Sequence, residues 1–258
     1  MSASPQNKPR GCATLVGAGP GSPDLLTLRA VRVIKQADVI LFDALIDPSI
    51  LDLARPDARR IDVGKRCGRH AMNQAAINTL IVRFAQAGAH VVRLKGGDPL
   101  VFGRGGEELD SLRAAGVPVE IVPGITAACA AAASLQIPLT HRDIARSLHF
   151  VTGHGSDGAV PAHDWRALAA SGGTIVAYMA SKTFASVAAN LIEAGLPAAT
   201  PVVAIENASR VNERHWPGTL GDIADRLAAE QPAGPTLVVV GEVVGLAQIV
   251  QETVRLAA

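Results

Sequence analysis

The chain has 258 residues, more than the usual single domain of about 100 to 200 residues, and 48% of them are hydrophobic, so one large or two modest domains are expected. Charged residues make up 18%, and the formal net charge of +1 argues against a surface field built for nucleic acid or an anionic membrane. No apolar stretch approaches the roughly 20 residues of a membrane-spanning helix. We therefore expect a soluble protein that binds neither nucleic acid nor membrane.

The N-terminus and the cysteines carry information about the compartment. Residues 1–10 are polar and lack the apolar core of a secretory signal, so we expect residues 1–12 to form a mobile arm. Cys12, Cys67 and Cys129 are odd in number and show no paired ligand spacing. They favour reduced thiols in the cytoplasm and predict no metal site.

Short β-rich runs alternate with helix-patterned segments along the whole chain, which is typical of an α/β protein with parallel sheets and crossover helices. Ser22-Pro23-Asp24 predicts a helix start, because a cap residue, a proline and an acid precede apolar residues at helical spacing. Residues 73–87 predict a second helix that Gly88 ends. The other predicted elements are strands over 13–17, 39–43, 60–63, 90–95, 119–122, 148–152, 174–179, 201–206 and 237–240, and helices over 164–170, 184–194 and 220–230.

A domain junction is expected near Pro138. The alanine-rich segment 126–135 runs into this proline, which interrupts helical continuation. The predicted N-terminal α/β domain is therefore 13–137 and the C-terminal α/β domain 138–258.

Four predicted strands of the first half end in glycine or charged residues, and ligands of α/β sheets gather at the carboxyl ends of strands. We expect these ends to face one crevice. They are residues 17–21, 42–43, 64–66 and 96–98.

The first of these turns also suggests a different enzyme class. Residues 16–22 resemble a dinucleotide-binding fingerprint, although Ser22 stands where the third glycine belongs. Asp43 occupies the place of the acid that binds a ribose in that fold. A nicotinamide-dependent dehydrogenase is therefore an alternative on these residues alone.

An ordered series of motifs resembles the tetrapyrrole methyltransferase family over nearly all of residues 14–244. The longest is the glycine-rich stretch from Arg93 to Glu108. The others are Val16-Gly-Ala-Gly-Pro-Gly, Phe42-Asp43-Ala-Leu, Gly64-Lys-Arg, Val122-Pro-Gly-Ile-Thr-Ala127, Ile137-Pro-Leu-Thr-His-Arg142, Val151-Thr-Gly-His154, Tyr178-Met179 and Gly234-Pro-Thr-Leu-Val-Val-Val-Gly-Glu-Val-Val244. The resemblance implies two α/β domains with S-adenosylmethionine in the cleft between them, and a homodimer.

The resemblance also implies an activity. The expected reaction transfers two methyl groups in succession from S-adenosylmethionine to uroporphyrinogen III, giving precorrin-1 and then precorrin-2 on the route to sirohaem or cobalamin, with S-adenosylhomocysteine as the other product. A methyltransferase for a later corrin intermediate, for RNA or for a modified histidine is an alternative within related enzymes. A non-catalytic tetrapyrrole carrier is the alternative outside them.

Matching positions imply the roles of individual residues. Asp43 is the expected proton acceptor and Lys65 the expected proton donor. Gly96 and Gly97 lack a Cβ, which lets their backbone approach a ligand. The expected cofactor contacts are Pro20, Gly96, Gly97, Asp98, Val101, Thr126, Ala127, Met179, Ala208 and Thr236. The cations expected to bind the polycarboxylate substrate are Arg66, Arg69, His70, Arg104 and Arg142.

Overall fold

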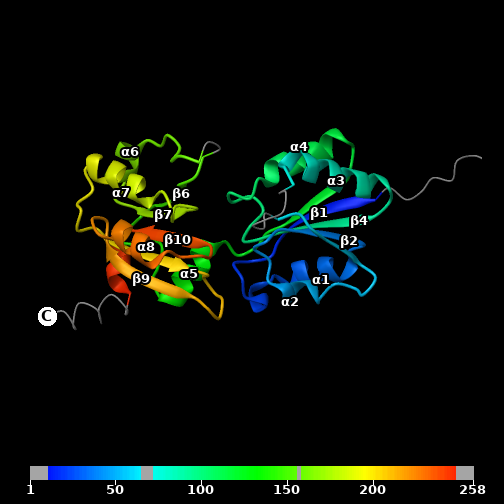
Figure 1. Ribbon diagram of the computed structural model, residues 1–258, viewed down its shortest axis with the longest axis horizontal. Coiled ribbons are helices and arrows are strands. Elements are labelled where there is room, and N and C mark those ends of the chain that lie inside the picture. Colours follow the sequence, from blue (N-terminus) through cyan, green and yellow to red (C-terminus); the bar gives the residue numbers. More distant parts are fainter. Residues whose placement is uncertain (1–10, 65–71, 156–157, 248–258) are drawn as a thin grey trace, which may run out of the picture. The chain divides into compact units, whose positions relative to one another are not determined.

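The computed structural model describes residues 11–64, 72–155 and 158–247, and the chain divides into two compact units, 1–126 and 127–258 (Figure 1). The division lies eleven residues before the junction expected after residue 137. Helix α5 (Ala127–Leu135) accounts for the difference. Its buried Ala128 and Ala131 pack with Val176 and Val203 in the core of the second unit, so the helix belongs there.

The first unit is built on a five-stranded sheet in the order β3-β2-β4-β1-β5, with every pair parallel, as the sequence pattern predicts. All five predicted strands are confirmed to within a residue at either end. Strand β1 begins at Cys12, inside the predicted arm, whose residues 1–10 lie outside the described residues. The strands are β1 (Cys12–Gly17), β2 (Val39–Phe42), β3 (Arg59–Asp62), β4 (His90–Lys95) and β5 (Val119–Val122).

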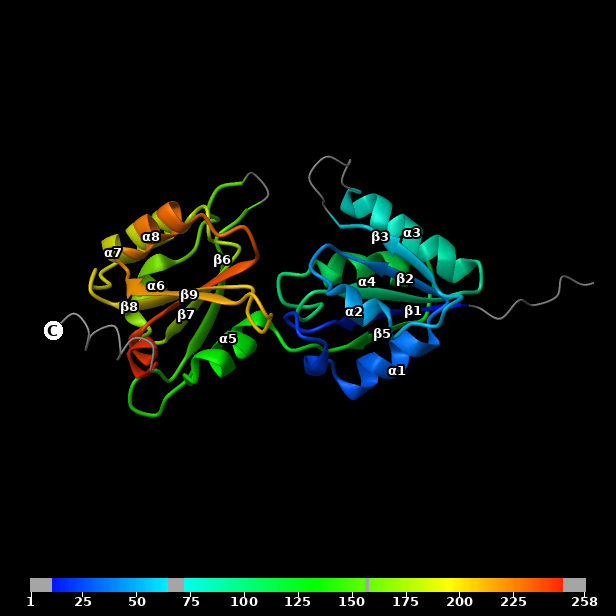
Figure 2. The same cartoon turned by 60° about the horizontal axis from the view of Figure 1, so that its bottom comes forward.

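Helices cover both faces of this sheet (Figure 2). Ala30 and Ile34 of α1 and Ile50 of α2 pack on the face formed by Val92 and Leu94. The helices α3 and α4 cover the opposite face, where the alternate residues of β4 point. The bounds are α1 (Leu28–Gln36), α2 (Pro48–Leu51), α3 (Gln74–Gln86) and α4 (Gly105–Ala114).

One helix of the first unit starts later than expected, and another was not predicted. Pro23–Leu25 form only a short 3-10 turn (η1), and α1 starts later because the hydroxyl of Thr27 accepts a hydrogen bond from the N–H of Ala30. Helix α4 begins with Gly105 and Gly106, so the glycine pattern concealed it. Helix α3 is confirmed, with Asn73 as its N-cap.

The second unit has its own five-stranded sheet in the order β6-β7-β10-β8-β9. The expectation of a parallel sheet is wrong here. Only β6 and β7 are parallel, and β10 runs antiparallel to both β7 and β8. The strands are β6 (Leu148–Thr152), β7 (Thr174–Tyr178), β8 (Pro201–Glu206), β9 (Arg214–Thr219) and β10 (Thr236–Val240).

Strand β9 was not predicted. It contains Pro217 and Gly218, which are tolerated because β9 is the edge strand and pairs only with β8. Helices α6 (Trp165–Ala170), α7 (Phe184–Glu193) and α8 (Ile223–Glu230) cover one face of the sheet. Helix α5 and the C-terminal 3-10 turn η2 (Glu242–Leu246) cover the other. Across the described ranges, no helix combines the length and apolar character needed to cross a bilayer.

Candidate active site

The carboxyl ends of β3, β2, β4 and β1 lie along one edge of the first sheet, because neighbouring parallel strands end on the same side. The loops after β1 and β4 are joined there. The N–H of Gly97 donates to the carbonyl of Gly19 over 2.7 Å, and the N–H of Gly19 donates back to Gly97 over 3.2 Å. Pro20 follows this junction directly. The described residues of the four strand ends therefore lie at one edge of the sheet, and the crevice expected there stays a prediction.

The glycines at this edge serve two purposes. A Cβ on Gly17 would lie 2.5 Å from the backbone nitrogen of Gly124. The ends of β1 and β5 can therefore come this close only because Gly17 has no side chain. Gly97 is different. Its φ of +67° is the left-handed region that favours glycine, and an added Cβ would meet only the Cα of Thr126, 4.0 Å away. The backbone of Gly97 is therefore left open on the side where a ligand is expected.

Asp98 organises the same loop. Its Oδ1 accepts a hydrogen bond from the N–H of Leu100 over 2.8 Å, and its Oδ2 accepts one from the N–H of Gly124 over 3.0 Å. Each carboxylate oxygen keeps a further lone pair. Asp98 thus holds the loop against the end of β5 and still has acceptor capacity for a hydroxyl or an ammonium group.

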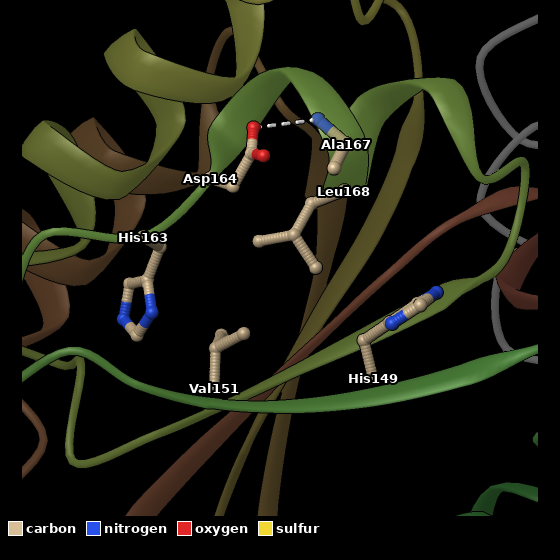
Figure 3. Close-up of a pocket in the computed structure, with 6 residues that line it drawn as sticks. All are labelled: His149, Val151, His163, Asp164, Ala167 and Leu168. Atoms are coloured by element: carbon tan, nitrogen blue, oxygen red, sulfur yellow. Dashed lines mark hydrogen bonds between the residues drawn. The ribbon is translucent and has the colours of Figure 1, made fainter.

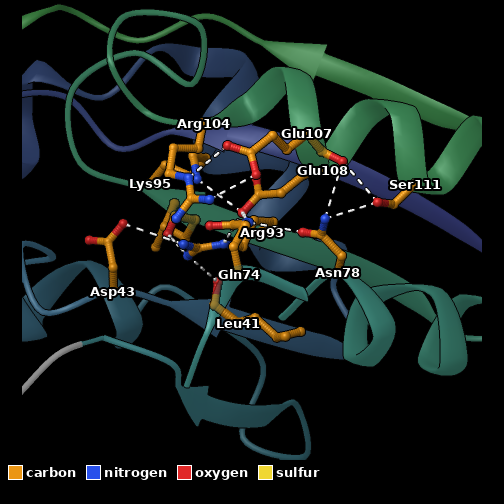
Figure 4. Close-up of polar contacts among 11 residues, drawn as sticks. Leu41, Asp43, Gln74, Asn78, Arg93, Lys95, Arg104, Glu107, Glu108 and Ser111 are labelled. Atoms are coloured by element: carbon orange, nitrogen blue, oxygen red, sulfur yellow. Dashed lines mark hydrogen bonds and ion pairs between the residues drawn. The ribbon is translucent and has the colours of Figure 1, made fainter. Parts of the chain in front are cut away.

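A cluster of four charged residues lies beside these loops; we call Asp43, Arg93, Lys95 and Glu108 the β4 charge cluster (Figure 4). Arg93 Nε and Lys95 Nζ each lie 3.0 Å from Glu108 Oε1, and Arg93 Nη2 lies 3.6 Å from Asp43 Oδ2. Burial, and next the charge of Arg93, lower the pKa of Lys95. Asp43, which follows β2, is the least buried of the four.

The predicted site residues of the second unit also gather at one edge of their sheet. Because β10 is antiparallel to β7 and β8, its first residue, Thr236, lies at the edge where those strands end. Met179 directly follows β7, and Ala208 lies two residues after the end of β8. The hydroxyl of Tyr178 accepts a hydrogen bond from the N–H of Ala128 at the start of α5, where Ala127 lies. Met179 is 49% exposed, whereas Ala208 and Thr236 are buried.

Left-handed backbone conformations occur beside several of these residues. Met179 has a φ of +54°, and Asn207 and Ser209, on either side of Ala208, have φ values of +55° and +68°. Phe102 and Arg104, in the loop after β4, also have left-handed φ values. Each such conformation costs about 1–3 kcal/mol of folding free energy, and such conformations cluster at ligand sites.

The cations expected to bind substrate are only partly described. Arg104 is exposed and forms a two-pronged ion pair with Glu107, with N–O distances of 2.7 and 2.8 Å, which raises the pKa of its guanidinium. Arg142 is exposed. Lys65, Arg66, Arg69 and His70 lie outside the described residues.

Arg93, Lys95 and Glu108 were not among the residues expected at the site, although the sequence holds a sign of them. Two cations at alternate positions of a strand point to one face of the sheet. A strand in the middle of a parallel sheet is buried on both faces, so such cations require a buried carboxylate. The sequence does not show which carboxylate this is.

One hollow of about 260 Å³ lies in the second unit, between β6 and α6, and none of the expected site residues lines it (Figure 3). Its polar groups already have partners. His163 Nε2 lies 3.0 Å from the carbonyl oxygen of Thr152, His149 Nε2 lies 3.0 Å from Ser147 Oγ, and Asp164 caps α6 through the N–H of Ala167. These contacts indicate a structural hollow rather than a reactive site.

Residues 14–224 match the model of a family described as Tetrapyrrole (Corrin/Porphyrin) Methylases. A sirohaem synthase from Pseudomonas fluorescens is 52% identical over 232 residues, which are 90% of this chain and 50% of that protein. The chain therefore spans about half the length of the curated relatives it matches.

Solved structures are similar over nearly the whole chain. A uroporphyrin-III C-methyltransferase from Thermus thermophilus, complexed with S-adenosylhomocysteine, is 40% identical with a TM-score of 0.78, covering 92% of this chain and 100% of that one. A cobalt precorrin-4 methyltransferase is 28% identical with a TM-score of 0.80, covering 90% and 95%. These likenesses confirm the fold class expected from the motifs.

Proposed function

Because this chain belongs to the tetrapyrrole (corrin/porphyrin) methylase family, we propose that it is an S-adenosylmethionine-dependent C-methyltransferase acting on uroporphyrinogen III. The product is precorrin-2, formed by two successive methylations through precorrin-1. The observation that carries the proposal is the 40% identity, over 92% of this chain, with a uroporphyrin-III C-methyltransferase that binds S-adenosylhomocysteine.

The described residues fit this cofactor. S-adenosylmethionine has no phosphate, so its site needs hydrogen-bonding backbone and short side chains rather than a phosphate-binding helix start. In the first unit, the space beside Gly97, whose N–H and C=O already pair with Gly19, leaves room for a ligand, and the remaining acceptor capacity of Asp98 supplies hydrogen bonding. We propose that both sets of residues contact the cofactor: Pro20, Gly96, Gly97, Asp98, Val101 and Thr126, and Ala127, Met179, Ala208 and Thr236.

The methyl donor supplies an electrophilic sulfonium methyl group. A pyrrole carbon attacks this methyl, the new C–C bond forms as the C–S bond breaks, and the bonding electrons stay on sulfur. The adduct must then lose a proton from the ring. Asp43 is the proposed acceptor of this proton, since its carboxylate is partly exposed at the end of β2. Lys65 is the proposed proton donor, and a proton that it gives to the macrocycle must be lost again, because each methyl transfer releases one proton overall. Alignment of the reactants supplies much of the remaining acceleration.

The substrate carries many carboxylates while the chain has a net charge of only +1, so recognition must be local. We propose that Arg66, Arg69, His70, Arg104 and Arg142 supply it. Arg104 would exchange its exposed pair with Glu107 for a substrate carboxylate, at little cost because exposed pairs are weak.

We further propose that the chain acts as a homodimer in the cytoplasm. The free thiols of Cys12 and Cys129 are compatible with a reducing compartment. A molar mass of twice 26.6 kDa in light scattering supports the dimer, and a single chain mass would contradict it.

Mass spectrometry after anaerobic incubation with S-adenosylmethionine and uroporphyrinogen III tests the function. Addition of two methyl groups to the macrocycle is expected. The likeness to a cobalt precorrin-4 methyltransferase makes a later corrin intermediate the second candidate. Methylation of such an intermediate, with no reaction on uroporphyrinogen III, would overturn the first proposal in favour of the second.

A further inference from the structure

The β4 charge cluster is more buried than stability alone explains. The side chains of Arg93, Lys95 and Glu108 are 5%, 4% and 0% exposed, and that of Asp43 is 25% exposed. Replacing buried ion pairs by apolar residues of similar size is often neutral or stabilising. A cluster of two cations and two carboxylates therefore calls for a role beyond holding the sheet together.

The contacts of Arg93 fix the direction of its guanidinium group. Its Nε donates to Glu108 Oε1 over 3.0 Å. Its Nη1 donates to the carbonyl oxygens of Leu94, over 2.9 Å, and Leu41, over 3.4 Å. With those donors engaged, Nη2 is the nitrogen next to Asp43, 3.6 Å from its Oδ2 (Figure 4). Glu108 and the strand backbone thus determine where the positive charge meets Asp43.

Glu108 is in turn held by groups from two other elements. Its Oε1 accepts hydrogen bonds from Lys95 Nζ, over 3.0 Å, and from Gln74 Nε2, over 3.1 Å, as well as from Arg93. Its Oε2 is buried without a hydrogen-bond partner among the described residues. Lys95 and Arg93 repel each other, which contributes to the lowered pKa of Lys95, and Glu108 lies between them. Removal of the Glu108 charge would leave two close cations unbalanced.

Asp43 receives support on both carboxylate oxygens. Its Oδ1 accepts a hydrogen bond from the N–H of Leu45 over 3.2 Å, and its Oδ2 faces Arg93. The orientation of the carboxylate thus depends on one backbone group and on one cation. That cation is placed by Glu108.

We propose that Glu108, held by Lys95, is a positioning residue that fixes Arg93 against Asp43 and so sets the orientation of the carboxylate that accepts the ring proton. This inference rests on the proposed function. It assigns Glu108 no contact with either substrate. A displacement of a reacting group by about 1 Å can lower the rate roughly a hundredfold. Glu108 can therefore affect turnover through the position of Arg93 and Asp43, without touching the substrate.

The main test is the double variant Lys95→Met with Glu108→Leu, which removes one cation and one anion and keeps the cluster neutral. We expect it to fold, because apolar replacement of a buried pair is tolerated. It should bind S-adenosylhomocysteine with unchanged Kd and keep the KM for uroporphyrinogen III, while kcat falls on the order of a hundredfold. Glu120→Gln is the matched control, because Glu120 forms an exposed pair with Arg29 in the same unit and should keep wild-type kcat.

A double-mutant cycle that combines the Lys95→Met/Glu108→Leu variant with Asp43→Asn separates positioning from a general structural effect. If Glu108 acts through Asp43, adding the double variant to Asp43→Asn should lower kcat no further. Wild-type kcat in the folded double variant, or an additive loss in the cycle, would overturn the inference. If the double variant does not fold, Glu108→Asp keeps the charge that balances Arg93 and Lys95 but shortens the side chain by one methylene group, and it should lower kcat about tenfold at unchanged Kd. Wild-type kcat in that variant would again overturn the inference. Failure of the wild type to methylate uroporphyrinogen III would instead reject the proposed function.

Discussion

Asp98 Oδ2 accepts a hydrogen bond from the backbone N–H of Gly124 over 3.0 Å, and this bond ties the loop after β4 to the end of β5. The two residues are far apart in sequence, and each belongs to a motif of the family. The bond keeps the open backbone of Gly97 in a defined position.

Asp98→Ala should weaken the binding of S-adenosylhomocysteine by about tenfold to a hundredfold. The substitution removes two charge-assisted bonds, worth about 1.5–3 kcal/mol each, and any contact of the carboxylate with the ligand. Calorimetric titration measures the Kd. Asp57→Ala, at a side chain that is 75% exposed, is the control. Equal affinity in the two variants would remove Asp98 from the site.

Gly97→Ala should destabilise the protein by about 1–2 kcal/mol and weaken cofactor binding, because its φ of +67° is strained for any residue with a Cβ. Gly106→Ala is the matched control. Gly106 lies in the first turn of α4, and an added Cβ would meet nothing within 4 Å, so its stability should stay within about 1 kcal/mol of wild type. Denaturant unfolding and titration with S-adenosylhomocysteine measure both effects. Unchanged affinity in a folded Gly97→Ala variant would show that the loop has only a structural role.

Asp43→Asn should retain S-adenosylhomocysteine affinity and form little precorrin-2. Loss of a proton acceptor typically lowers the rate by about a hundredfold to ten-thousandfold. Wild-type protein should not bind NADH, since Asp43 is assigned to the macrocycle and not to a ribose. Single-turnover methylation assays measure the rate. Full turnover by the variant would leave positioning of the substrates as the source of catalysis.

Replacing Arg66 and Arg69 together by alanine should raise the KM for uroporphyrinogen III and spare the affinity for S-adenosylmethionine, because these cations are assigned to substrate carboxylates. The wild-type KM should rise with salt more steeply than that of the variant, since ions screen exposed contacts. Replacement of Arg29 and Arg55, which pair with surface carboxylates, is the control. An equal loss of affinity for both ligands would indicate a role in folding.

Glu206→Gln should destabilise the protein at pH 7 by about 1.5–3 kcal/mol. Burial opposes ionisation of Glu206, but hydrogen bonds from Arg214 Nε and the N–H of Gly234 outweigh it and lower the pKa below the ordinary 4.5. The stability that ionised Glu206 contributes is thus complete above pH 4.5 and is lost as the pH falls through the lower folded-state pKa. Unfolding by urea from pH 7 to pH 3 should show the gap between wild type and variant closing in acid. A gap that stays constant would contradict this account.

Much of the fold could be predicted from the sequence, because local patterns determine it. The apolar runs of the first unit became parallel strands at the expected residues, and Asn73 capped α3 as its side chain predicts. Parallel strands joined by crossover helices end on one edge, so the gathering of Gly17, Asp43 and Gly97 also followed from sequence order.

The tertiary structure decided the rest, because those features depend on contacts between distant elements. Strand periodicity does not encode direction, so the antiparallel pairing of β10 with β7 and β8 could not be predicted. Helix α5 joined the second unit because its small apolar face fits that core. The pairing of Arg93 with Glu108 requires α4 to pack on β4, and only that packing selects Glu108 from the other carboxylates of the chain to balance two buried cations.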